Sequence, residues 1–511
     1  MGQNSLYAIG IGGTGAKCLE AIAQLAAVGL FADTPIKLLF VDADETNGSL
    51  ERAKNSLSIY RKCQKLLAGG GNSPWLKTPI KLYYPDLWSP FGKTNTSKDL
   101  ASFYSYNNLQ QNPEGLGNLF DVLYTEEERK ASLDVGFRGR PAIGSAVMSH
   151  LDLDNLEDDP WASLTQDILA DVGSGNSPRI FLCGSIFGGT GASGLPTLGR
   201  LIYNKLEKEK IQGAKISCLF VLPYFRFPQP TGKDAANQEV YARSEQFLLN
   251  TEAALRYYVN QNQYFHTVYL LGNQNLSNYE FSIGKNTQRN EPHFIEVYSA
   301  LAARHFLLDT PSRANTVVIN SRQNSQSITW QDLPDSSQVQ SKLVNATRFA
   351  YVWLSNILPE LNTAAKIGVA SFQKGAPWFV EFYRPSQGVM GKFFDRRGED
   401  LPDFNDDEQK KAIDIITEWC QDYLRWLSEV HQCDGDDIEL FRYRAFADLG
   451  KDLQGEYLSD LVIGDKRDSN AKKQDTIQQL KLQLESATSN SDSAQKGTIG
   501  LAKAIYQLCR L

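Results

Sequence analysis

The first half of the chain alternates short apolar runs with longer stretches in which apolar residues recur at helical spacing. Short runs rich in Ile, Leu, Val and Phe predict buried strands. They lie at 6–9, 36–41, 180–183, 216–222 and 266–271. Leu19, Ile22 and Leu25 share one face of a helix expected at 16–28. Strands separated by helices predict an α/β protein with a doubly wound, mainly parallel sheet.

The pattern changes after about residue 290. Apolar residues surround most of a helix expected at 292–308, which indicates a helix buried between layers, with His305 in the core. Further helices are expected at 342–358 and 408–430, with a strand at 378–383. Two segments lack a clear period. The first, at 84–138, predicts an irregular surface insertion, and the second, at 465–498, predicts a solvated helix or a flexible segment.

Composition narrows the class of protein. A chain of 511 residues with 42% hydrophobic residues predicts two or three domains with packed cores. The formal net charge of −7 argues against a dedicated nucleic-acid binder. Seven scattered cysteines, without a CxxC pair, and five histidines predict no metal-ligand cluster and a cytoplasmic location. No apolar run reaches about 18 residues, so neither a signal peptide nor a membrane span is expected.

The first glycine-rich motif is Gly-Ile-Gly-Gly-Thr-Gly at 10–15, between a predicted strand and a predicted helix. Glycines allow a tight turn and a close approach of backbone N–H groups to a phosphate, at the positive end of a helix. The same pattern is also compatible with a strand-to-helix turn that binds nothing. It is not a Walker loop, because Ala16 follows the last glycine and Lys17 comes one place late.

The second motif is Gly-Gly-Thr-Gly-Ala-Ser-Gly at 188–194, after the strand expected at 180–183. Dinucleotide-binding folds generally use a single glycine-rich fingerprint. Two such loops at one end of a parallel sheet suit a triphosphate, with Thr190 offering a hydroxyl to the phosphates or to a hydrated Mg²⁺.

This second motif resembles the signature of the tubulin/FtsZ superfamily, in which GGTG is followed by Ala or Ser and then Gly. The match runs from Gly188 to Ala192 and departs at Phe187 and Ser193, with Gly194 one place late. The chain therefore resembles a divergent prokaryotic tubulin-like branch over roughly residues 5–335. The resemblance implies a GTP-binding protein with Mg²⁺ that hydrolyses GTP to GDP and phosphate and assembles head-to-tail into a filament.

The resemblance also implies a set of nucleotide-binding residues. In the two main loops they are Gly12, Gly13, Thr14, Gly15, Lys17, Gly188, Gly189, Thr190, Gly191 and Ala192. Elsewhere they are Asp42 and Asp44 near phosphate and Mg²⁺, Gly69, Gly70 and Gly71 facing the γ-phosphate, Glu239 and Arg243 near ribose and phosphate, and Asn290 on the guanine edge. The loop at 223–227 would lie near the ribose. Several have plain alternatives: a surface loop at 68–72, an exposed i,i+4 pair for Glu239 and Arg243, and a helix cap for Asn290.

Catalysis in this superfamily uses acids on a loop after the central helix, and the loop reaches the nucleotide of the next subunit. Asp332 and Asp335 lie in the corresponding region, three residues apart. A carboxylate there would position the attacking water. The alternative is a turn in which an Asp caps the following helix. Arg138 and Arg140 flank Gly139. The two arginines are compatible with either a phosphate contact or a surface loop.

The expected organisation is a Rossmann-like nucleotide-binding domain at 1–290, a central helix at 291–310, a second, largely helical α+β domain at 311–464, and a polar tail at 465–511 that is open to a protein partner. Two other nucleotide-binding classes fit the first loop, a ThiF-like adenylating enzyme and an NAD-binding Rossmann protein. Both leave the loop at 188–194 without a use, and the first lacks its usual zinc ligands. A further alternative is a GTP-binding switch that does not polymerise.

Overall fold

A computed structural model describes residues 4–68, 73, 75–83, 87–91, 99–111, 113–133, 136–153, 160–228, 244–260, 264–280, 290–308, 316–319, 327–386, 400–433, 437–448, 457–485 and 496–511. The chain forms two compact units. The first comprises Met1–Ile22, Thr34–Asn55 and Ile80–Gln323, and the second comprises Ala23–Asp33, Ser56–Pro79 and Asn324–Leu511.

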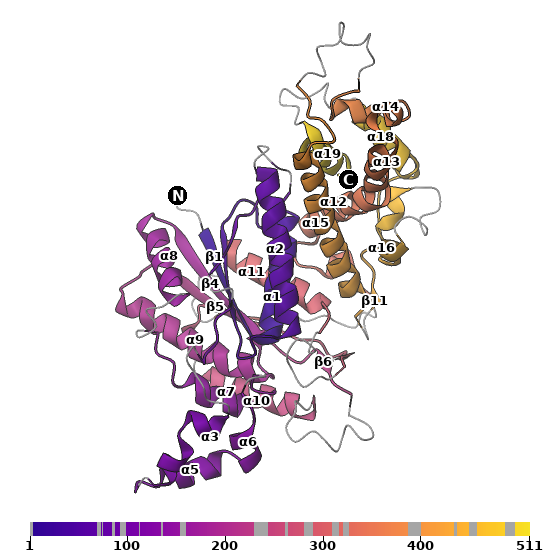
Figure 1. The fold of residues 1–511 in the computed structure, drawn as a ribbon. Coiled ribbons are helices and arrows are strands. Elements are labelled where there is room, and N and C mark those ends of the chain that lie inside the picture. The colour runs from indigo at the N-terminus through magenta and orange to yellow at the C-terminus, as the bar shows by residue number, and fades with distance from the viewer. Residues whose placement is uncertain are drawn as a thin grey trace. The chain divides into compact units, whose positions relative to one another are not determined.

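The first unit is built on a seven-stranded sheet with the order β3-β2-β1-β4-β5-β7-β9, in which every neighbouring pair is parallel (Figure 1). Its strands are β1 (Asn4–Ile11), β2 (Ile36–Val41), β3 (Ile80–Leu82), β4 (Ser177–Ser185), β5 (Lys215–Val221), β7 (Thr267–Leu271) and β9 (Thr316–Ile319). A two-stranded parallel ladder joins β6 (Phe225–Arg226) to β8 (Ser277–Asn278). The predicted strands and the parallel, doubly wound sheet are confirmed.

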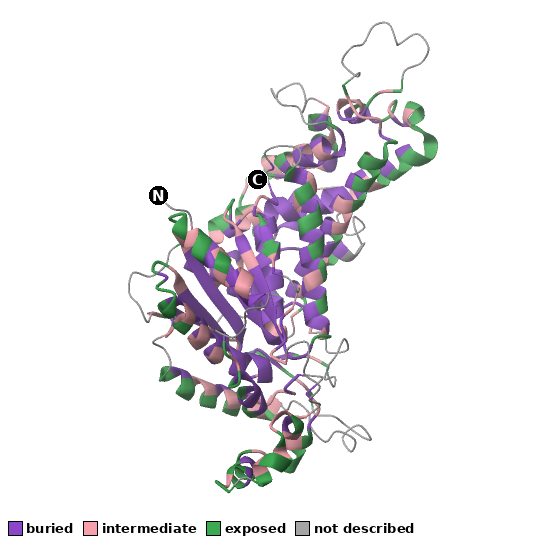
Figure 2. Ribbon diagram, turned by 60° about the vertical axis from the view of Figure 1, so that its left-hand side comes forward, coloured by how far each residue is buried: buried purple, intermediate pink, exposed green. Residues whose placement is uncertain are grey.

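Helices cover both faces of this sheet, and the central strands are buried (Figure 2). One face packs on α8 (Trp161–Gly173), α9 (Gly189–Lys208) and α10 (Phe247–Val259), in a core that includes Ile9, Leu182 and Phe220. The other face carries α11 (Phe294–Leu308), where Phe306 contacts Phe181 of β4. Both α1 (Gly12–Ala27) and α2 (Gly48–Ala68) begin in this unit. Because α11 is buried over most of its circumference, the expected central helix is confirmed.

The segment at 84–138 differs from the irregular insertion that was expected. Its described part forms four short helices, α3 (Leu100–Phe103), α4 (Tyr106–Gln110), α5 (Leu116–Leu123) and α6 (Glu126–Lys130). Aromatic side chains, among them Tyr104 and Phe120, pack with α7 (Pro141–Met148) in a small core of their own. The aromatic residues that suggested irregular structure form this core. The helices were not predicted because segments of four to eight residues are too short to show a helical period.

The second unit is mainly helical. Its elements are α12 (Ser336–Val352), α13 (Leu358–Ile367), α14 (Val369–Phe372), α15 (Asp407–His431), α16 (Arg444–Asp448), α17 (Ser469–Gln474), α18 (Ile477–Leu484) and α19 (Gly497–Leu508), with a parallel pair of β10 (Ser327–Ile328) and β11 (Asp437–Ile438). A π-helical turn at Trp353–Ile357 links α12 to α13.

Two expectations for this unit were wrong. The strand expected at 378–383 is a 3₁₀ helix at Pro377–Glu381, because Pro377 opens a helical turn whose aromatic residues Trp378 and Phe379 are buried. The segment at 465–498 is neither a single solvated helix nor wholly flexible, since α17 and α18 lie within it and α18 buries Ile477, Leu480 and Leu484.

An aromatic cluster forms the centre of the second unit. Trp75 stacks on Tyr506 of α19, with ring centroids 4.4 Å apart and an interplanar angle of 6°. The same indole contacts Phe349 of α12 and Trp419 of α15. Asp422 of α15 accepts hydrogen bonds from Gln24, in the last turn of α1, and from Ser56, near the middle of α2. The later turns of α1 and α2 therefore belong to the core of the second unit.

Candidate functional site

The strand order places a topological switch point at β1 and β4. Residues after β1 lead to β2 and β3 on one side, and β4 leads to β5, β7 and β9 on the other. In open α/β sheets, ligands bind beyond the carboxyl ends of the strands at such a point. Both glycine motifs lie there, because α1 begins directly after β1 and only three residues separate the end of β4 from the start of α9.

The first glycine motif allows β1 to turn into α1 without an intervening loop. Gly12 has a φ of +73°, a backbone conformation that residues other than glycine rarely adopt. Gly10 and Gly15 are fixed by packing, since a Cβ on Gly15 would lie 2.6 Å from the carbonyl carbon of Gly10. The N–H groups of the first helical residues, Gly12 onward, have no acceptor within α1 and point toward the carboxyl edge of the sheet.

The second glycine motif forms the first turn of α9. Gly188 is its extended N-cap residue, and Gly189, Thr190 and Gly191 are its first helical residues. A Cβ on Gly191 would overlap the carbonyl oxygen of Ser185, and one on Gly189 would lie 2.7 Å from Cβ of Phe137. Tight packing therefore requires these glycines whether or not a ligand is present.

The two motifs are neighbours. A Cβ built on Gly12 would lie 3.3 Å from Cβ of Thr190 and 3.5 Å from the backbone nitrogen of Gly191. Two helix N-termini therefore meet at one point, and each contributes a partial positive charge and unbonded N–H groups. The arrangement suits a polyanionic group.

Two buried carboxylates adjoin the second motif. Asp42 and Asp44 follow β2, and each is only 4% exposed. The Thr190 hydroxyl donates to Oδ1 of Asp42 over 3.2 Å, and Asp44 accepts from the N–H and hydroxyl of Thr46. Burial raises the pKa of Asp42 to about 7, and the charge of Asp44 adds to this rise, while hydrogen bonds from Asp44 N–H and Thr190 oppose it. A carboxyl group that titrates near neutral pH is typical of functional sites.

Two further segments adjoin the motifs, and neither could be assigned to the site from its residue pattern. Gly136, with a φ of +74°, lies against Asp44, and the following Phe137 and Arg140 lie against Gly189. The Arg140 guanidinium pairs with Glu128 over 2.6 Å. Asn47 caps α2 by accepting from Ser49 N–H, and its amide nitrogen would be 3.2 Å from a Cβ on Gly13.

Lys17, for which a phosphate contact was expected, pairs with a side chain of the central helix. Its ammonium forms an ion pair of 2.6 Å with Glu296 of α11, and both side chains are 1% exposed. The same ammonium donates to the hydroxyl of Tyr224, over 3.2 Å. Lys17 thus joins α1 to the central helix. Tyr224 itself, in the loop expected near the ribose, is buried.

Asn290 lies before α11 and is held through its backbone. Its N–H donates to Ser49 over 3.3 Å, and its carbonyl accepts from Arg52 over 2.7 Å. Both partners belong to α2. His293 rather than Asn290 caps α11, since its Nδ1 accepts from Ile295 N–H and its ring is fully buried.

Some expected site residues lie outside the described residues, namely Gly69, Gly70, Gly71, Glu239 and Arg243. Asp332 and Asp335 belong to the second unit. Asp332 accepts from the N–H and hydroxyl of Thr329, over 2.7 and 2.9 Å, in a capping box. Asp335, with a φ of +52°, is the N-cap residue of α12. His305, expected in the core, is exposed and hydrogen-bonds Tyr269 through Nδ1.

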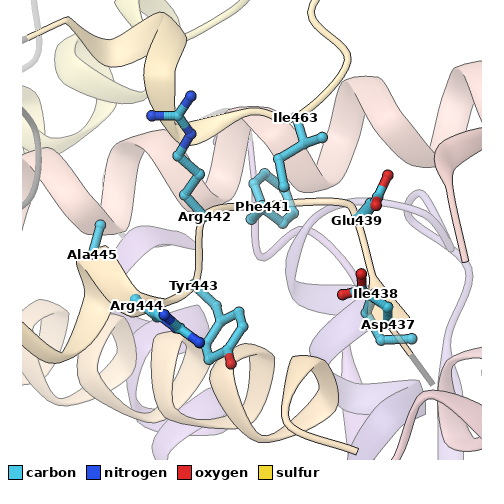
Figure 3. A pocket seen from close by; sticks show the side chains of 9 residues that line it. All are labelled: Asp437, Ile438, Glu439, Phe441, Arg442, Tyr443, Arg444, Ala445 and Ile463. Atoms are coloured by element: carbon cyan, nitrogen blue, oxygen red, sulfur yellow. The ribbon is translucent and has the colours of Figure 1, made fainter. Parts of the chain in front are cut away.

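The second unit contains a pocket of about 340 Å³ (Figure 3). One wall carries the acidic residues Asp437 and Glu439, and another carries Arg442 and Arg444, with Phe441 between them. The pocket borders the end of β11 and the start of α16.

Comparisons with known proteins give little further guidance. The sequence matches no family model and no curated protein. Sixteen chains of solved structures match by fold. One belongs to a helical model of the two-stranded TubZ-Bt filament, with 14% identity and a TM-score of 0.23 over 58% of this chain. The match covers about half of that chain, 52%, and an agreement this low carries no argument about function. Among the described residues, no helix is long and apolar enough to cross a membrane.

Proposed function

We propose that this chain binds a guanine nucleotide at the switch point between β1 and β4 and acts as a tubulin-like GTPase. The contact between Gly12 and the Thr190–Gly191 turn carries the proposal, because it brings two helix N-termini to one place. A single N-terminus is enough for the pyrophosphate of a dinucleotide. The second N-terminus is best explained by a longer phosphate chain.

The acidic residues support a divalent cation beside that phosphate chain. Asp42, Asp44 and the Thr190 hydroxyl are oxygen donors, which Mg²⁺ prefers. Without a cation, two buried carboxylates next to a triphosphate would repel it. Mg²⁺ would supply charge neutralisation for the phosphates, and the side chains of Asp42, Asp44 and Thr190 would hold it.

The choice of guanine depends on Asn290. An amide side chain both donates and accepts, which matches the mixed hydrogen-bonding edge of guanine. The backbone of Asn290 is fixed to Ser49 and Arg52 at the start of α2, so its position is set independently of its side chain. Asn290→Ala should therefore keep the fold and lower GTP affinity while ATP affinity stays unchanged.

The experiment that tests the proposal compares GTP, ATP and NAD binding to the full chain by calorimetry, with and without Mg²⁺. We expect GTP to bind most tightly and to depend on Mg²⁺. Tighter binding of NAD would favour a dinucleotide protein, and tighter ATP binding would favour an adenylating enzyme. Either result would overturn the proposal.

Hydrolysis and head-to-tail assembly form a second layer of the proposal. They depend on Asp332 and Asp335, whose spacing matches the superfamily's catalytic loop. Pelleting with GTP and with a slowly hydrolysed analogue separates a polymerising GTPase from a switch that binds GTP as a monomer. Sedimentation that is independent of nucleotide would argue against assembly driven by GTP.

A further inference from the structure

Basic side chains gather at the amino edge of the sheet, at the opposite ends of the strands from the glycine motifs. Arg179 of β4 and Lys215 of β5 are direct partners in the parallel register. His266 immediately precedes β7, and Ile216 N–H donates to its Nδ1 over 3.3 Å. Three basic residues therefore come from three adjacent strands.

Arg179 is the unusual member of this group. It is 9% exposed, and its Nε has no hydrogen-bond acceptor in the described part of the chain. No acidic side chain among the described residues pairs with it. Burying an unpaired charge is costly, and a buried donor without an acceptor adds to that cost. Burial also lowers the pKa of Arg179. A native structure normally pairs such a group with an ion or water.

Two buried hydroxyls next to this group also lack partners within the described residues. They belong to Ser217 and Thr267, which are register partners on β5 and β7 and are both fully buried. Ser217 lies two residues after Lys215, so both point to the same face of the sheet. Phe181 shows that this is the α11 face, and Arg179 lies two residues before it. The unpaired polar groups therefore share one face and one end of the sheet.

His266 lies at the same end of the sheet, but it is level with Ile216 and comes one residue before Thr267, so the alternation of side chains places it on the opposite face. Because Nδ1 of His266 accepts a hydrogen bond, the neutral ring carries its proton on Nε2 and can donate it. Burial, followed by the charges of Lys215 and Arg179, lowers the pKa of His266. The pKa of Lys215 is likewise lowered by burial and then by Arg179. Arg179 and Lys215 thus repel each other, and no acidic side chain among the described residues pairs with either of them.

We propose that Arg179 and Lys215 form a binding site for a phosphate dianion, either free or as a phosphate monoester. Arg179 and Lys215 carry two positive charges, which a dianion neutralises and a single carboxylate does not. Guanidinium and ammonium groups are the usual phosphate donors in proteins. From Arg179 to Ser185, the strand β4 separates this site from the switch point by roughly 20 Å at about 3.3 Å per residue. The inference does not depend on the proposed GTP site.

The test measures thermal stability of the full chain against increasing inorganic phosphate, with glycerol 2-phosphate and acetate as separate arms. Wild type should be stabilised by both phosphates and not by acetate. Arg179→Gln and Lys215→Gln should each lose this response, whereas Arg256→Gln, on the exposed face of α10, should keep it. Thr190→Val should also keep it, because that residue lies at the other site. Stabilisation by the free ion alone would identify inorganic phosphate as the ligand.

A second measurement does not depend on unfolding. With ¹⁵N-labelled arginine, the Nε–H signal of Arg179, assigned from its absence in Arg179→Gln, should shift as phosphate is added. Without phosphate, Arg179→Gln should be at least as stable as wild type, since it removes an unpaired buried charge. Equal phosphate responses in wild type, Arg179→Gln and Lys215→Gln, or an Arg179 signal that does not move, would overturn the proposal.

Discussion

The Thr190 hydroxyl donates a hydrogen bond to Oδ1 of Asp42 across 3.2 Å, which joins the first turn of α9 to the residue after β2. Asp42 is buried, and β1 lies between β2 and β4 in the sheet. The bond therefore spans the switch point. It holds a hydroxyl and a carboxylate where the two helix N-termini meet.

The Thr190 hydroxyl offers the most direct test of the proposed nucleotide site. Thr190→Val keeps the shape of the side chain and removes the hydroxyl, so we expect at least a tenfold loss of GTP–Mg²⁺ affinity, about 1.4 kcal/mol. Thr190→Ser should retain most of the affinity. The matched control is Thr197→Val in the same helix, whose hydroxyl bonds only Ser193 carbonyl. Equal calorimetric affinities for Thr190→Val and Thr197→Val would remove the hydroxyl from the site.

The raised pKa of Asp42 leads us to expect that the stability of the fold depends on pH. Its pKa rises from 3.8 to about 7 on folding, so the folded chain holds a proton that the unfolded chain has lost. Stability therefore falls as pH rises from about 4 to 7, and the full penalty applies above pH 7. Asp42→Asn should remove this slope and be more stable than wild type at pH 8 by roughly 1–3 kcal/mol, with little difference at pH 4.

Urea unfolding at both pH values, without nucleotide, measures this effect. Asp33→Asn, at an exposed position, is the control. Mg²⁺ with GTP should stabilise wild type at pH 8 and have a weaker effect on Asp42→Asn. A pH profile of Asp42→Asn that is parallel to wild type would show that Asp42 is ionised throughout.

Substitutions in the buried ion pair of Lys17 and Glu296 distinguish a structural role of Lys17 from a phosphate contact. Lys17→Met leaves a carboxylate buried without its partner, which should cost about 3–5 kcal/mol. Adding Glu296→Gln should recover much of that loss, because glutamine still accepts from His293 N–H, now made to Glu296 over 3.1 Å. The double variant should bind GTP like wild type. A folded double variant with strongly reduced affinity would restore the phosphate role of Lys17.

The carboxylates of the second unit are tested by separating turnover from binding. Asp335→Ala and the double change with Asp332→Ala should abolish GTP turnover and leave GTP affinity intact. Because Asp332 caps a turn, Asp332→Ala should also cost about 1 kcal/mol. Thr329→Ala breaks the same capping box and serves as the stability control. Turnover that is unchanged in the double variant would exclude both acids from the mechanism.

Glycine substitutions distinguish packing from ligand access. Gly191→Ala should destabilise the chain strongly, since its methyl group would overlap the carbonyl of Ser185. Gly13→Ala should fold, because its methyl group meets only the side-chain amide of Asn47, at 3.2 Å. Gly173→Ala, where the space is open, is the control for both. Thermal melts that rank Gly13→Ala below Gly191→Ala would contradict this packing.

Much of the architecture of the first unit could be predicted from the sequence. Strands such as Ile36–Val41 are short, apolar and bounded by polar residues, so their pattern identifies them without tertiary information. The two glycine motifs likewise indicate strand-to-helix turns. Their mutual contact follows from strand order, which pairs β1 with β4 across more than 160 residues and has no local signature.

Tertiary partners explain what the sequence did not predict. Lys17 follows the first glycine motif by two residues, and its ion-pair partner, Glu296, lies on a helix that is distant in the sequence. The aromatic run at 378–383 has strand-like composition, yet Pro377 and burial favour a 3₁₀ turn. The burial of Arg179 could not be predicted from the sequence, because a single arginine at the start of a strand normally reaches solvent. Only the fold shows that this residue is buried.

The direct join between β1 and α1 has a consequence for how the site responds to a ligand. The strand ends at Ile11 and the helix begins at Gly12, so no flexible residue lies between them. Because the β1–α1 junction has no flexible residue, its backbone is already ordered, and binding a ligand there would cost little conformational entropy. It also cannot close like a lid. Any change of shape that accompanies occupancy must displace a whole helix, and this stiffness would convert a small event at its N-terminus into a rigid-body movement.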